Sequence, residues 1–224
     1  MAKLSVVGIG PGSPDYVTPA ARKSVRGAEL VVGAERSLSL MKSEIRGVEA
    51  TLTARNMNEL LELAVAAAEE GKEVAILSTG DPGFSGLLRP VARHAQGRRV
   101  DLCVIPGISS IQACAARLCM SWEDAGLFSL HRGAPPEKWS ELARTIKEGR
   151  DIIVLPDQKA SSPREIVRFL LSQGLDRRTP VFVCESITLR GERIVGSTLE
   201  NASELDFDPL CVVVVKGTGS REGS

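Results

Sequence analysis

The sequence lacks an excess of charge of either sign, and it lacks any long apolar run. Its 224 residues include 28 basic and 28 acidic side chains, which gives a formal net charge of zero. Nucleic-acid-binding and polybasic membrane-binding surfaces carry concentrated positive charge, and a membrane-spanning helix needs roughly 20 consecutive apolar residues. The composition therefore predicts no nucleic-acid partner and no membrane partner. The first residues enter a strand pattern rather than a secretory signal, so we expect a cytoplasmic protein.

Phosphate-binding motifs are missing as well. The sequence contains no Gly-Lys followed by Ser or Thr, which excludes a P-loop. Gly8 and Gly10 begin like the dinucleotide-binding fingerprint, but Ser13 stands where that motif needs its third glycine. Pro11 and Pro14 also keep a helix from starting close enough to place its N–H groups on a pyrophosphate. We therefore expect no dinucleotide on this loop.

Cysteine is scarce, and its spacing does not fit a metal site. The five cysteines are odd in number and lie mostly in apolar runs: Cys103, Cys114, Cys119, Cys184 and Cys211. Such positions are typical of reduced cysteines that act as small apolar core residues in a cytosolic protein. The sequence therefore predicts reduced cysteines and no protein-bound metal.

What the sequence does contain is a regular alternation of short apolar runs and longer amphipathic segments, which predicts an α/β fold. We expect strands at 4–7, 30–32, 48–52, 73–77, 100–105, 127–130, 151–155, 181–184 and 210–215. We expect helices at 19–26, 35–41, 56–70, 87–95, 109–118, 138–148 and 162–174, and a hairpin over 189–195 around Gly191.

Several helix starts carry capping signals. Thr18 followed by Pro19 predicts an N-cap with proline at the first helical position. Capping boxes are predicted where a cap residue is followed three positions later by Glu or Gln. The pairs that fit this spacing are Asn56 with Glu59, Ser109 with Gln112, and Ser162 with Glu165.

The alternation is lost at 119–124, which we interpret as a link between two halves. The predicted organisation is an N-terminal α/β domain at 1–118, the link at 119–124, a C-terminal α/β domain at 125–216 and a flexible tail at 217–224. Small ligands bind preferentially in the cleft between two such domains.

The stretch that organises the chain is 77–86, at the end of the apolar run 74–77. It places three glycines, a proline and Asp81 within seven residues, 80–86. Such a stretch is either a tight strand-to-helix turn, in which Asp81 bonds to its own backbone, or a loop that brings main-chain groups close to a ligand.

Two further loops of the same kind, 8–15 and 106–110, follow other predicted strands and favour a ligand loop. None of the three loops suits a phosphate ligand, but each can approach a ligand through its backbone. A nucleoside cofactor without phosphates fits this chemistry, and S-adenosylmethionine is the commonest example.

The motifs in these loops, VGIGPGSP at 7–14, STGDPGF at 78–84 and IPGISS at 105–110, resemble the signature loops of the tetrapyrrole (corrin/porphyrin) methylases. That resemblance implies a two-domain α/β enzyme that binds S-adenosyl-L-methionine in the interdomain cleft. The second half, with SLHRG at 129–133 and VCE at 183–185, is similar to the branch of the family that methylates C5 of cobalt-precorrin-7 in cobalamin synthesis.

Two positions depart from that branch. The branch usually has an aromatic residue where this chain has Ser85, and it has His-Gly-Arg where this chain has His131-Arg132-Gly133. Both positions lie in loops expected to face the cleft. The resemblance therefore supports cofactor binding more firmly than it supports the fit of a particular substrate.

The resemblance also implies site residues. The positions that match cofactor contacts in the family are Pro11, Gly80, Asp81, Phe84, Ser109, Ser110 and Leu155. Two of them have structural alternatives, because Ser109 is also the expected N-cap of its own helix and Leu155 alone would be interpreted as a core residue. Arg36 and Arg132 are candidates to pair with the carboxylates of a corrin precursor. His131 is a candidate catalytic base or substrate hydrogen-bonding group, and otherwise a turn residue.

Three functions remain open at this stage: a corrinoid C-methyltransferase, a methylase of the same fold that acts on another tetrapyrrole, and a non-catalytic cofactor-binding module. The resemblance further implies a homodimer. It also implies a functional link to a separate C15-methylating decarboxylase, an activity that is fused to the C5 methylase in some pathways.

Overall fold

A computed structural model describes residues 3–131, 133–157 and 161–221. The chain forms two compact units, Met1–Ser109 and Ser110–Ser224, each with its own sheet. Within the described residues, none of the helices combines the length and the apolar character needed to traverse a bilayer.

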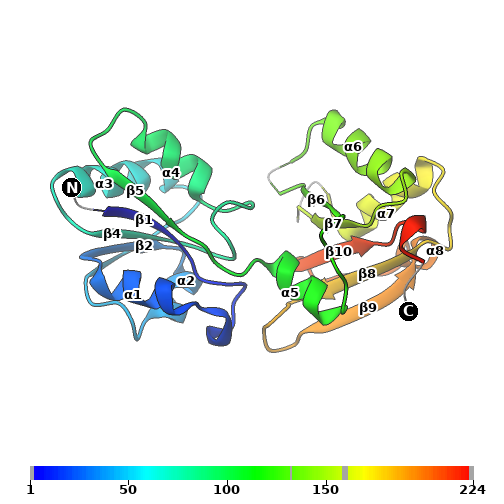
Figure 1. The fold of residues 1–224 in the computed structure, drawn as a ribbon, viewed down its shortest axis with the longest axis horizontal. Coiled ribbons are helices and arrows are strands. Elements are labelled where there is room, and N and C mark those ends of the chain that lie inside the picture. Colours follow the sequence, from blue (N-terminus) through cyan, green and yellow to red (C-terminus); the bar gives the residue numbers. More distant parts are fainter. Residues whose placement is uncertain (1–2, 132, 158–160, 222–224) are drawn as a thin grey trace. The chain divides into compact units, whose positions relative to one another are not determined.

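The first unit is built on a five-stranded sheet in which every neighbouring pair of strands is parallel, in the order β3-β2-β4-β1-β5 (Figure 1). Its strands are β1 (Lys3–Gly8), β2 (Leu30–Gly33), β3 (Val48–Thr51), β4 (Val74–Ser78) and β5 (Asp101–Ile105). Strands β1, β2 and β4 are almost wholly buried, as expected for a parallel sheet covered on both faces.

Helices cover both faces of this sheet. Successive side chains of a strand point to opposite faces, so Val6 packs with the helices of one face and Val7 with those of the other. Figure 1 shows α1 (Pro19–Gly27) and α2 (Glu35–Met41) on one face, and α3 (Met57–Glu69) and α4 (Leu88–Ala95) on the other.

The register of β1 places three loops at one edge of the sheet. Gly8, at the end of β1, lies beside Ser78 at the end of β4, and Val7 lies beside Ile105 at the end of β5. Because the three strands are parallel, the loops that follow them emerge together at the carboxyl edge, where open α/β sheets bind ligands.

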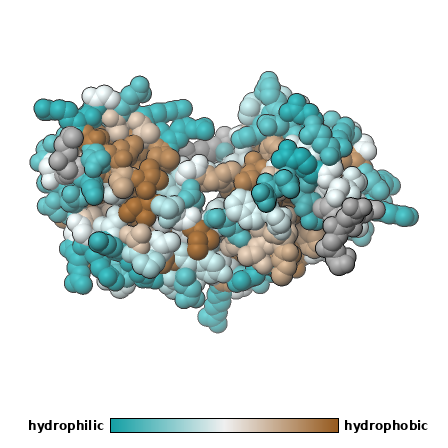
Figure 2. Space-filling model, in the orientation of Figure 1, coloured by the Kyte–Doolittle hydropathy of each residue, from teal (hydrophilic) through white to brown (hydrophobic). Residues whose placement is uncertain are grey.

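Strand β5 is the edge strand on this side, and it is less covered than its neighbours. Val104 is 41% exposed, and Figure 2 shows hydrophobic residues at the surface where β5 crosses the front of the first unit. The third loop therefore leaves the sheet next to accessible apolar surface.

The second unit contains a mixed sheet in the order β6-β7-β10-β8-β9. Its strands are β6 (Gly126–Ser129), β7 (Ile152–Leu155), β8 (Pro180–Glu185), β9 (Arg193–Thr198) and β10 (Cys211–Val215). Only the pair β6 and β7 is parallel, and the other three pairs are antiparallel.

One face of this sheet packs against α6 (Pro136–Lys147), α7 (Pro163–Ser172) and α8 (Leu199–Ala202) in a single core. Helix α5 (Ser110–Arg117) contacts β7 and β10. Cys114 on α5 also contacts Cys184 on β8, and their Sγ atoms lie 2.7 Å apart as two thiols. These contacts place α5 in the second unit. The predicted domain limits, with a link at 119–124, remain a prediction.

The α/β class and the positions of the nine expected strands are confirmed, with ends that differ by at most one residue. The Thr18 cap and the capping box of Ser162 with Glu165 are confirmed too. The capping box of Asn56 with Glu59 is wrong: the Asn56 side chain accepts hydrogen bonds from Thr53 and donates to Thr51 O, and makes no cap bond. A local turn has competed successfully for this side chain.

The hairpin around Gly191 is only partly correct. The antiparallel partner of β9 is β8, and the residues between them form a loop rather than a strand arm. Ser186 and Thr188 have φ of 47° and 67°, which breaks the extended conformation. The Thr188 N–H donates to a Glu192 carboxylate oxygen at 2.7 Å and closes the loop on itself.

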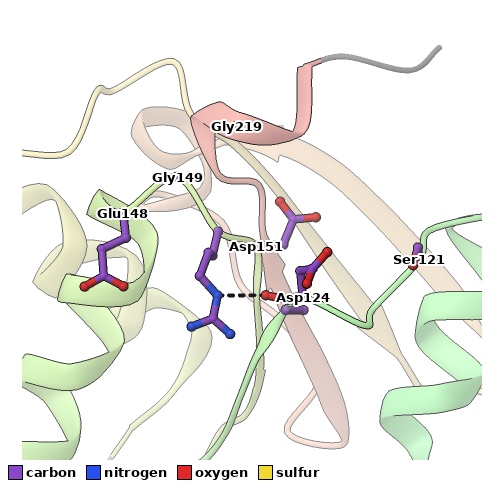
Figure 3. Close-up of a pocket in the computed structure, with 8 residues that line it drawn as sticks. Ser121, Asp124, Glu148, Gly149, Asp151 and Gly219 are labelled. Atoms are coloured by element: carbon purple, nitrogen blue, oxygen red, sulfur yellow. Dashed lines mark hydrogen bonds between the residues drawn. The ribbon is translucent and has the colours of Figure 1, made fainter.

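Part of the predicted tail is folded. Thr218–Arg221 forms a short 3-10 helix, and the Gly219 N–H donates to Gly149 O at 3.0 Å. Figure 3 shows the hollow beside this turn, where Arg150 donates to Asp124 O at 2.8 Å. The Asp151 carboxylate, also in view, accepts from Lys216 and from the Gly217 N–H, so it ties the end of β10 to the start of β7.

Candidate functional site

The three glycine-containing loops of the first unit meet through their backbones. Beyond the end of β1, the Ile9 N–H donates to Ser78 O at 3.0 Å, and the Gly80 N–H donates to Gly10 O at 2.8 Å. Gly10 and Gly80 thus form an isolated antiparallel bridge between the first two loops. The sequence predicted loops at neighbouring strand ends, and the structure brings them into direct contact.

Glycine is required where the loops cross. A Cβ atom on Gly8 would lie 2.4 Å from Gly107 N and 2.8 Å from Gly80 O, and a Cβ atom on Gly107 would lie 2.3 Å from Gly80 O. Separations this short leave no room for any side chain. The main chains of all three loops are therefore packed against one another at Gly8, Gly80 and Gly107.

Gly80 itself is constrained in a different way. Its φ is +70°, in the left-handed region that L side chains rarely adopt, whereas an added Cβ would meet only Ser109 Cα, at 3.8 Å. The space on the Cβ side of Gly80 is therefore nearly open. This is the kind of position at which a ligand can approach the main chain closely.

The Asp81 carboxylate joins the second loop to the third. Oδ1 accepts a hydrogen bond from the Gly83 N–H at 2.8 Å, and Oδ2 accepts one from the Gly107 N–H at 3.1 Å. The first bond confirms the turn that the sequence allowed, and the second is a cross-loop contact that the sequence did not predict. Contact between Asp81 and a cofactor stays a prediction.

The Ser78 side chain holds the end of the second loop, just before α4 begins. Its Oγ accepts from the Leu87 N–H at 3.2 Å, and Gly86 passes so close that an added Cβ would lie 2.6 Å from that oxygen. The half-buried Phe84 and the exposed Ser85 lie between these anchors. Ser85 has φ of 59°, a conformation that is costly for a residue with a side chain.

Arg36, predicted to bind substrate, has a partner in the first loop. Its Nη2 atom donates to Pro11 O at 3.2 Å from the first turn of α2, and the Pro11 ring is buried. On the same helix, Ser37 Oγ lies 3.4 Å from Thr79 Oγ1 in the second loop. Helix α2 therefore supports both loops. A contact between Arg36 and substrate remains a prediction.

The third loop ends at the start of α5. Ser109 is buried and immediately precedes the first helical residue, Ser110, which is half-buried. The position of Ser109 is thus that of an N-cap, as predicted, and its pairing with Gln112 stays a prediction. Ser109 Cα faces the open side of Gly80, 3.8 Å from where a Cβ atom of that glycine would lie.

The second unit holds the other predicted residues. The pairing of β6 with β7 brings them together, since the Leu130 N–H donates to Leu155 O at 2.8 Å and His131 follows in an exposed turn. The side chain of Leu155 is half-buried. Arg132 lies outside the described residues. Lys138 was not anticipated from the sequence, and its Nζ donates to Ser129 O at 2.5 Å below the same turn.

Charged residues that support the first loop were also missed. Glu44 is buried and binds Arg22 and Arg26, and Arg22 also donates to Pro14 O at 2.8 Å. No sequence signal marks this set, because Glu44 lies far along the chain from its partners. Among the described residues, no group of three or more His, Cys, Asp or Glu side chains gathers where it could hold a metal ion.

A parallel sheet with three glycine loops packed at its carboxyl edge is an arrangement in which open α/β proteins bind their ligands. A family model for the tetrapyrrole (corrin/porphyrin) methylases matches residues 3–203. The chain belongs to this family, and it is a methyltransferase.

Relatives support the same assignment. The chain is 38% identical over 214 residues to the "Probable cobalt-precorrin-7 C(5)-methyltransferase" of Methanocaldococcus jannaschii, covering 96% of this chain and 98% of the relative. It is 29% identical to the cobalt-precorrin-7 C(5)-methyltransferase of Salmonella typhimurium, at 95% and 98% coverage. It is also 26% identical to a cobalt-precorrin-4 C(11)-methyltransferase of M. jannaschii, at 90% and 81% coverage.

Solved structures share the fold. The methyltransferase CobJ superimposes with a TM-score of 0.83 at 18% identity, covering 100% of this chain and 98% of that one. A Thermus thermophilus uroporphyrin-III C-methyl transferase, solved with S-adenosylhomocysteine, gives 0.80 at 22% identity, with 97% and 98% coverage. At these identities the likeness concerns the fold alone.

Proposed function

We propose that this protein transfers a methyl group from S-adenosyl-L-methionine to C5 of cobalt-precorrin-7, a corrin precursor, in cobalamin biosynthesis. The observation that carries this proposal is the 38% identity, over nearly the full length of both chains, to a relative named for that activity. The glycine loops of the first unit, which leave main-chain groups and the open side of Gly80 accessible, support the proposal.

The site suits an uncharged nucleoside group better than a phosphate. Its loops offer main-chain groups and the open side of Gly80, and the Arg36 guanidinium beside the first loop donates to Pro11 O. The proposed cofactor contacts are Pro11, Gly80, Asp81, Phe84, Ser109, Ser110 and Leu155. Asp81 would favour a cationic group beside it, because a carboxylate is stabilised by a nearby positive charge.

When bound, S-adenosylmethionine supplies an electrophilic methyl group on a positively charged sulfur. The work left to the protein is to exclude water and to align the methyl group with a nucleophilic ring carbon, which orientation alone accelerates strongly. The packed loops of the first unit are suited to this task, because contacts at Gly8, Gly80 and Gly107 leave their main chains little freedom.

The proposed substrate contacts are Arg36, Arg132 and His131. A guanidinium pairs well with the peripheral carboxylates of a corrin precursor. His131 occupies an exposed turn after β6, where it could accept a ring proton if one must leave. Replacement of His131 by alanine should then lower the rate of methyl transfer more than it lowers substrate affinity. Equal turnover of the two proteins would reduce His131 to a turn residue.

The direct test is an assay with isotopically labelled S-adenosylmethionine and cobalt-precorrin-7, followed by location of the new methyl carbon by NMR. Label at C5 supports the proposal. Label at another carbon, or methylation of a different tetrapyrrole only, supports the second candidate, which the 26% identity to a C(11)-methyltransferase keeps in view. Binding of S-adenosylhomocysteine without turnover of any tetrapyrrole would leave a non-catalytic binding module.

The finer points of the proposal rest on the resemblance. We propose a cytoplasmic homodimer that holds no metal of its own and is linked in function to a separate C15-methylating decarboxylase. Sedimentation at micromolar concentration tests the first of these. A species of only about 23.9 kDa, the mass of one chain, would contradict the dimer.

A further inference from the structure

We infer that Arg22 is a positioning residue for methyl-donor binding, acting through the carbonyl of Pro14 on the first glycine loop. Its guanidinium has two partners, Glu44 Oε1 at 2.8 Å through Nη1 and Pro14 O at 2.8 Å through Nη2. One side chain thus connects a buried carboxylate to the backbone of the loop. The inference rests on the proposed function, because it assumes that this loop binds the methyl donor.

Glu44 holds the Arg22 guanidinium in one orientation. The Glu44 side chain is 7% exposed and also receives a hydrogen bond from Arg26, so the carboxylate is held from two turns of α1. These two arginines hold the pKa of Glu44 below its usual value, with Arg26 making the larger contribution. A carboxylate that stays ionised and buried keeps Arg22 oriented, since a guanidinium presents its donors in a rigid plane.

A series of contacts connects Pro14 to Gly80 in the second loop. Pro14 begins the short 3-10 turn Pro14–Tyr16, and Pro14 O also accepts from the Val17 N–H at 3.2 Å. Gly10 packs on the far end of this turn, where an added Cβ would lie 2.7 Å from Tyr16 O. Gly10 O in turn accepts from the Gly80 N–H.

A shift of the 3-10 turn should therefore displace Gly10 and, through it, Gly80. The turn packs closely against Gly10, and Gly10 O accepts a hydrogen bond from the Gly80 N–H. We propose that the open side of Gly80 faces the methyl donor. Arg36 holds the other half of the same loop through Pro11 O. Arg22 and Arg36 thus fix the loop at two carbonyls on either side of Gly12 and Ser13.

The chain offers a matched control. Arg26 binds the same Glu44 carboxylate from the next turn of α1. Among the described residues its side chain bonds to Glu44 and not to the loop, whereas Arg22 also donates to Pro14 O. Replacement of either arginine by methionine keeps a long apolar stem and removes one guanidinium from Glu44. Only the Arg22→Met change also removes the donor to Pro14 O.

The experiment is calorimetric titration of the full chain with S-adenosylhomocysteine, together with steady-state kinetics and thermal unfolding. We expect Arg22→Met to raise the Kd for S-adenosylhomocysteine roughly five- to twenty-fold, as for loss of a hydrogen bond to a charged donor. The KM for S-adenosylmethionine should rise in parallel, with kcat at saturating donor nearly unchanged. Arg26→Met should lower thermal stability to a similar extent but leave Kd within about twofold.

Arg22→Lys provides a second variant if Arg22→Met does not fold, because a lysine can reach one of the two partners and should give an intermediate Kd. Equal Kd values for wild type, Arg22→Met and Arg22→Lys would overturn the inference, as would an equal loss of affinity in Arg26→Met. Failure of the wild type itself to bind S-adenosylhomocysteine would instead overturn the proposed function.

Discussion

Asp81 Oδ2 accepts a hydrogen bond from the Gly107 N–H at 3.1 Å, across two loops that follow different strands of the first sheet. The other carboxylate oxygen accepts from Gly83 within its own loop. One side chain therefore couples the shape of the second loop to the position of the third. A ligand of these loops would therefore bind two loops that Asp81 already holds together.

The first prediction concerns this coupling. Asp81→Ala should increase amide hydrogen exchange at both Gly83 and Gly107 and should weaken S-adenosylhomocysteine binding. Asp81→Asn is the matched control, because its amide oxygen can still accept from one of the two N–H groups. We expect it to retain protection at one glycine only. Unchanged exchange at Gly107 in Asp81→Ala would show that the cross-loop bond does not hold the third loop.

A second prediction separates the two kinds of glycine in the site. Gly8→Ala should destabilise the fold by about 1–3 kcal/mol or more, because its Cβ would lie 2.4 Å from Gly107 N. Gly80→Ala should cost about 1–2 kcal/mol through its positive φ and yet fold. Alanine suits this test better than the β-branched valine, which tolerates positive φ poorly.

If the open side of Gly80 faces the cofactor, folded Gly80→Ala should bind S-adenosylhomocysteine roughly tenfold more weakly than wild type. Calorimetry checks the affinity, and urea unfolding checks that the protein is folded. Full affinity in a folded Gly80→Ala protein would remove this glycine from the binding site.

The loops could be predicted from the sequence because their signals are local. Glycine, proline and a carboxylate directly after an apolar run indicate a turn at a strand end, and parallel strands bring such ends to one edge. The contact between Asp81 and Gly107 could not be predicted in this way. It depends on the strand order, which places β1 between β4 and β5, and no local pattern specifies that order.

The support of the first loop was beyond prediction for a related reason. Arg22 and Glu44 meet because α1 and the turn that follows α2 pack on the same face, and charged residues are too common in the sequence for one pair to be singled out. The side chain of Asn56 illustrates a different failure. A capping box and a local turn compete for it, and in the structure the turn takes both its acceptor, through Thr53, and its donor, through Thr51 O.

The third prediction concerns the cysteines. Cys119 is exposed, whereas Cys114, Cys184 and Cys211 are buried. Burial raises the pKa of the Cys211 thiol to about 12, so it is almost entirely protonated and unreactive near pH 8. A disulfide reagent should therefore label Cys119 fastest in the native protein and label the three buried thiols only on unfolding. Loss of the fast phase in Cys119→Ser checks the assignment, and rapid labelling of Cys211 would contradict it.

A fourth prediction concerns acid stability. Glu185 at the end of β8 is buried, and its pKa is held below the usual 4.5 mainly by hydrogen bonds from Arg193, with the Asp208 N–H assisting. A lowered folded-state pKa stabilises the fold above pH 4.5, and this contribution is lost as the pH falls through the folded-state value. Glu185→Gln should therefore cost about 1–3 kcal/mol at pH 7.

The difference between wild type and Glu185→Gln should shrink as the pH falls below 4.5, because the carboxyl of the unfolded chain is protonated first, and it should vanish below the folded-state pKa, where the carboxyl is neutral in both states. Thermal unfolding of both proteins across the acid range measures this convergence. A constant difference at every pH would mean that Glu185 stabilises the fold through its shape rather than its charge.

The last prediction concerns Arg36, which the sequence assigned to the substrate and the structure places against the first loop. If Arg36 contacted substrate alone, Arg36→Ala would weaken tetrapyrrole binding and leave cofactor affinity nearly unchanged. Because its Nη2 donates to Pro11 O, we expect Arg36→Ala to weaken S-adenosylhomocysteine binding too, by roughly 1–3 kcal/mol as for a charged hydrogen bond.

Arg36→Lys separates the two roles. A lysine keeps the positive charge for a carboxylate of the substrate but replaces the planar donor that reaches Pro11 O. If Arg36 serves both, the lysine variant should recover tetrapyrrole affinity more than S-adenosylhomocysteine affinity. Separate titrations of the two ligands measure this. If Arg36→Lys recovers the affinity for both ligands equally, Arg36 acts through its charge alone. If Arg36→Ala loses affinity for neither ligand, the substrate binds on another surface of the protein.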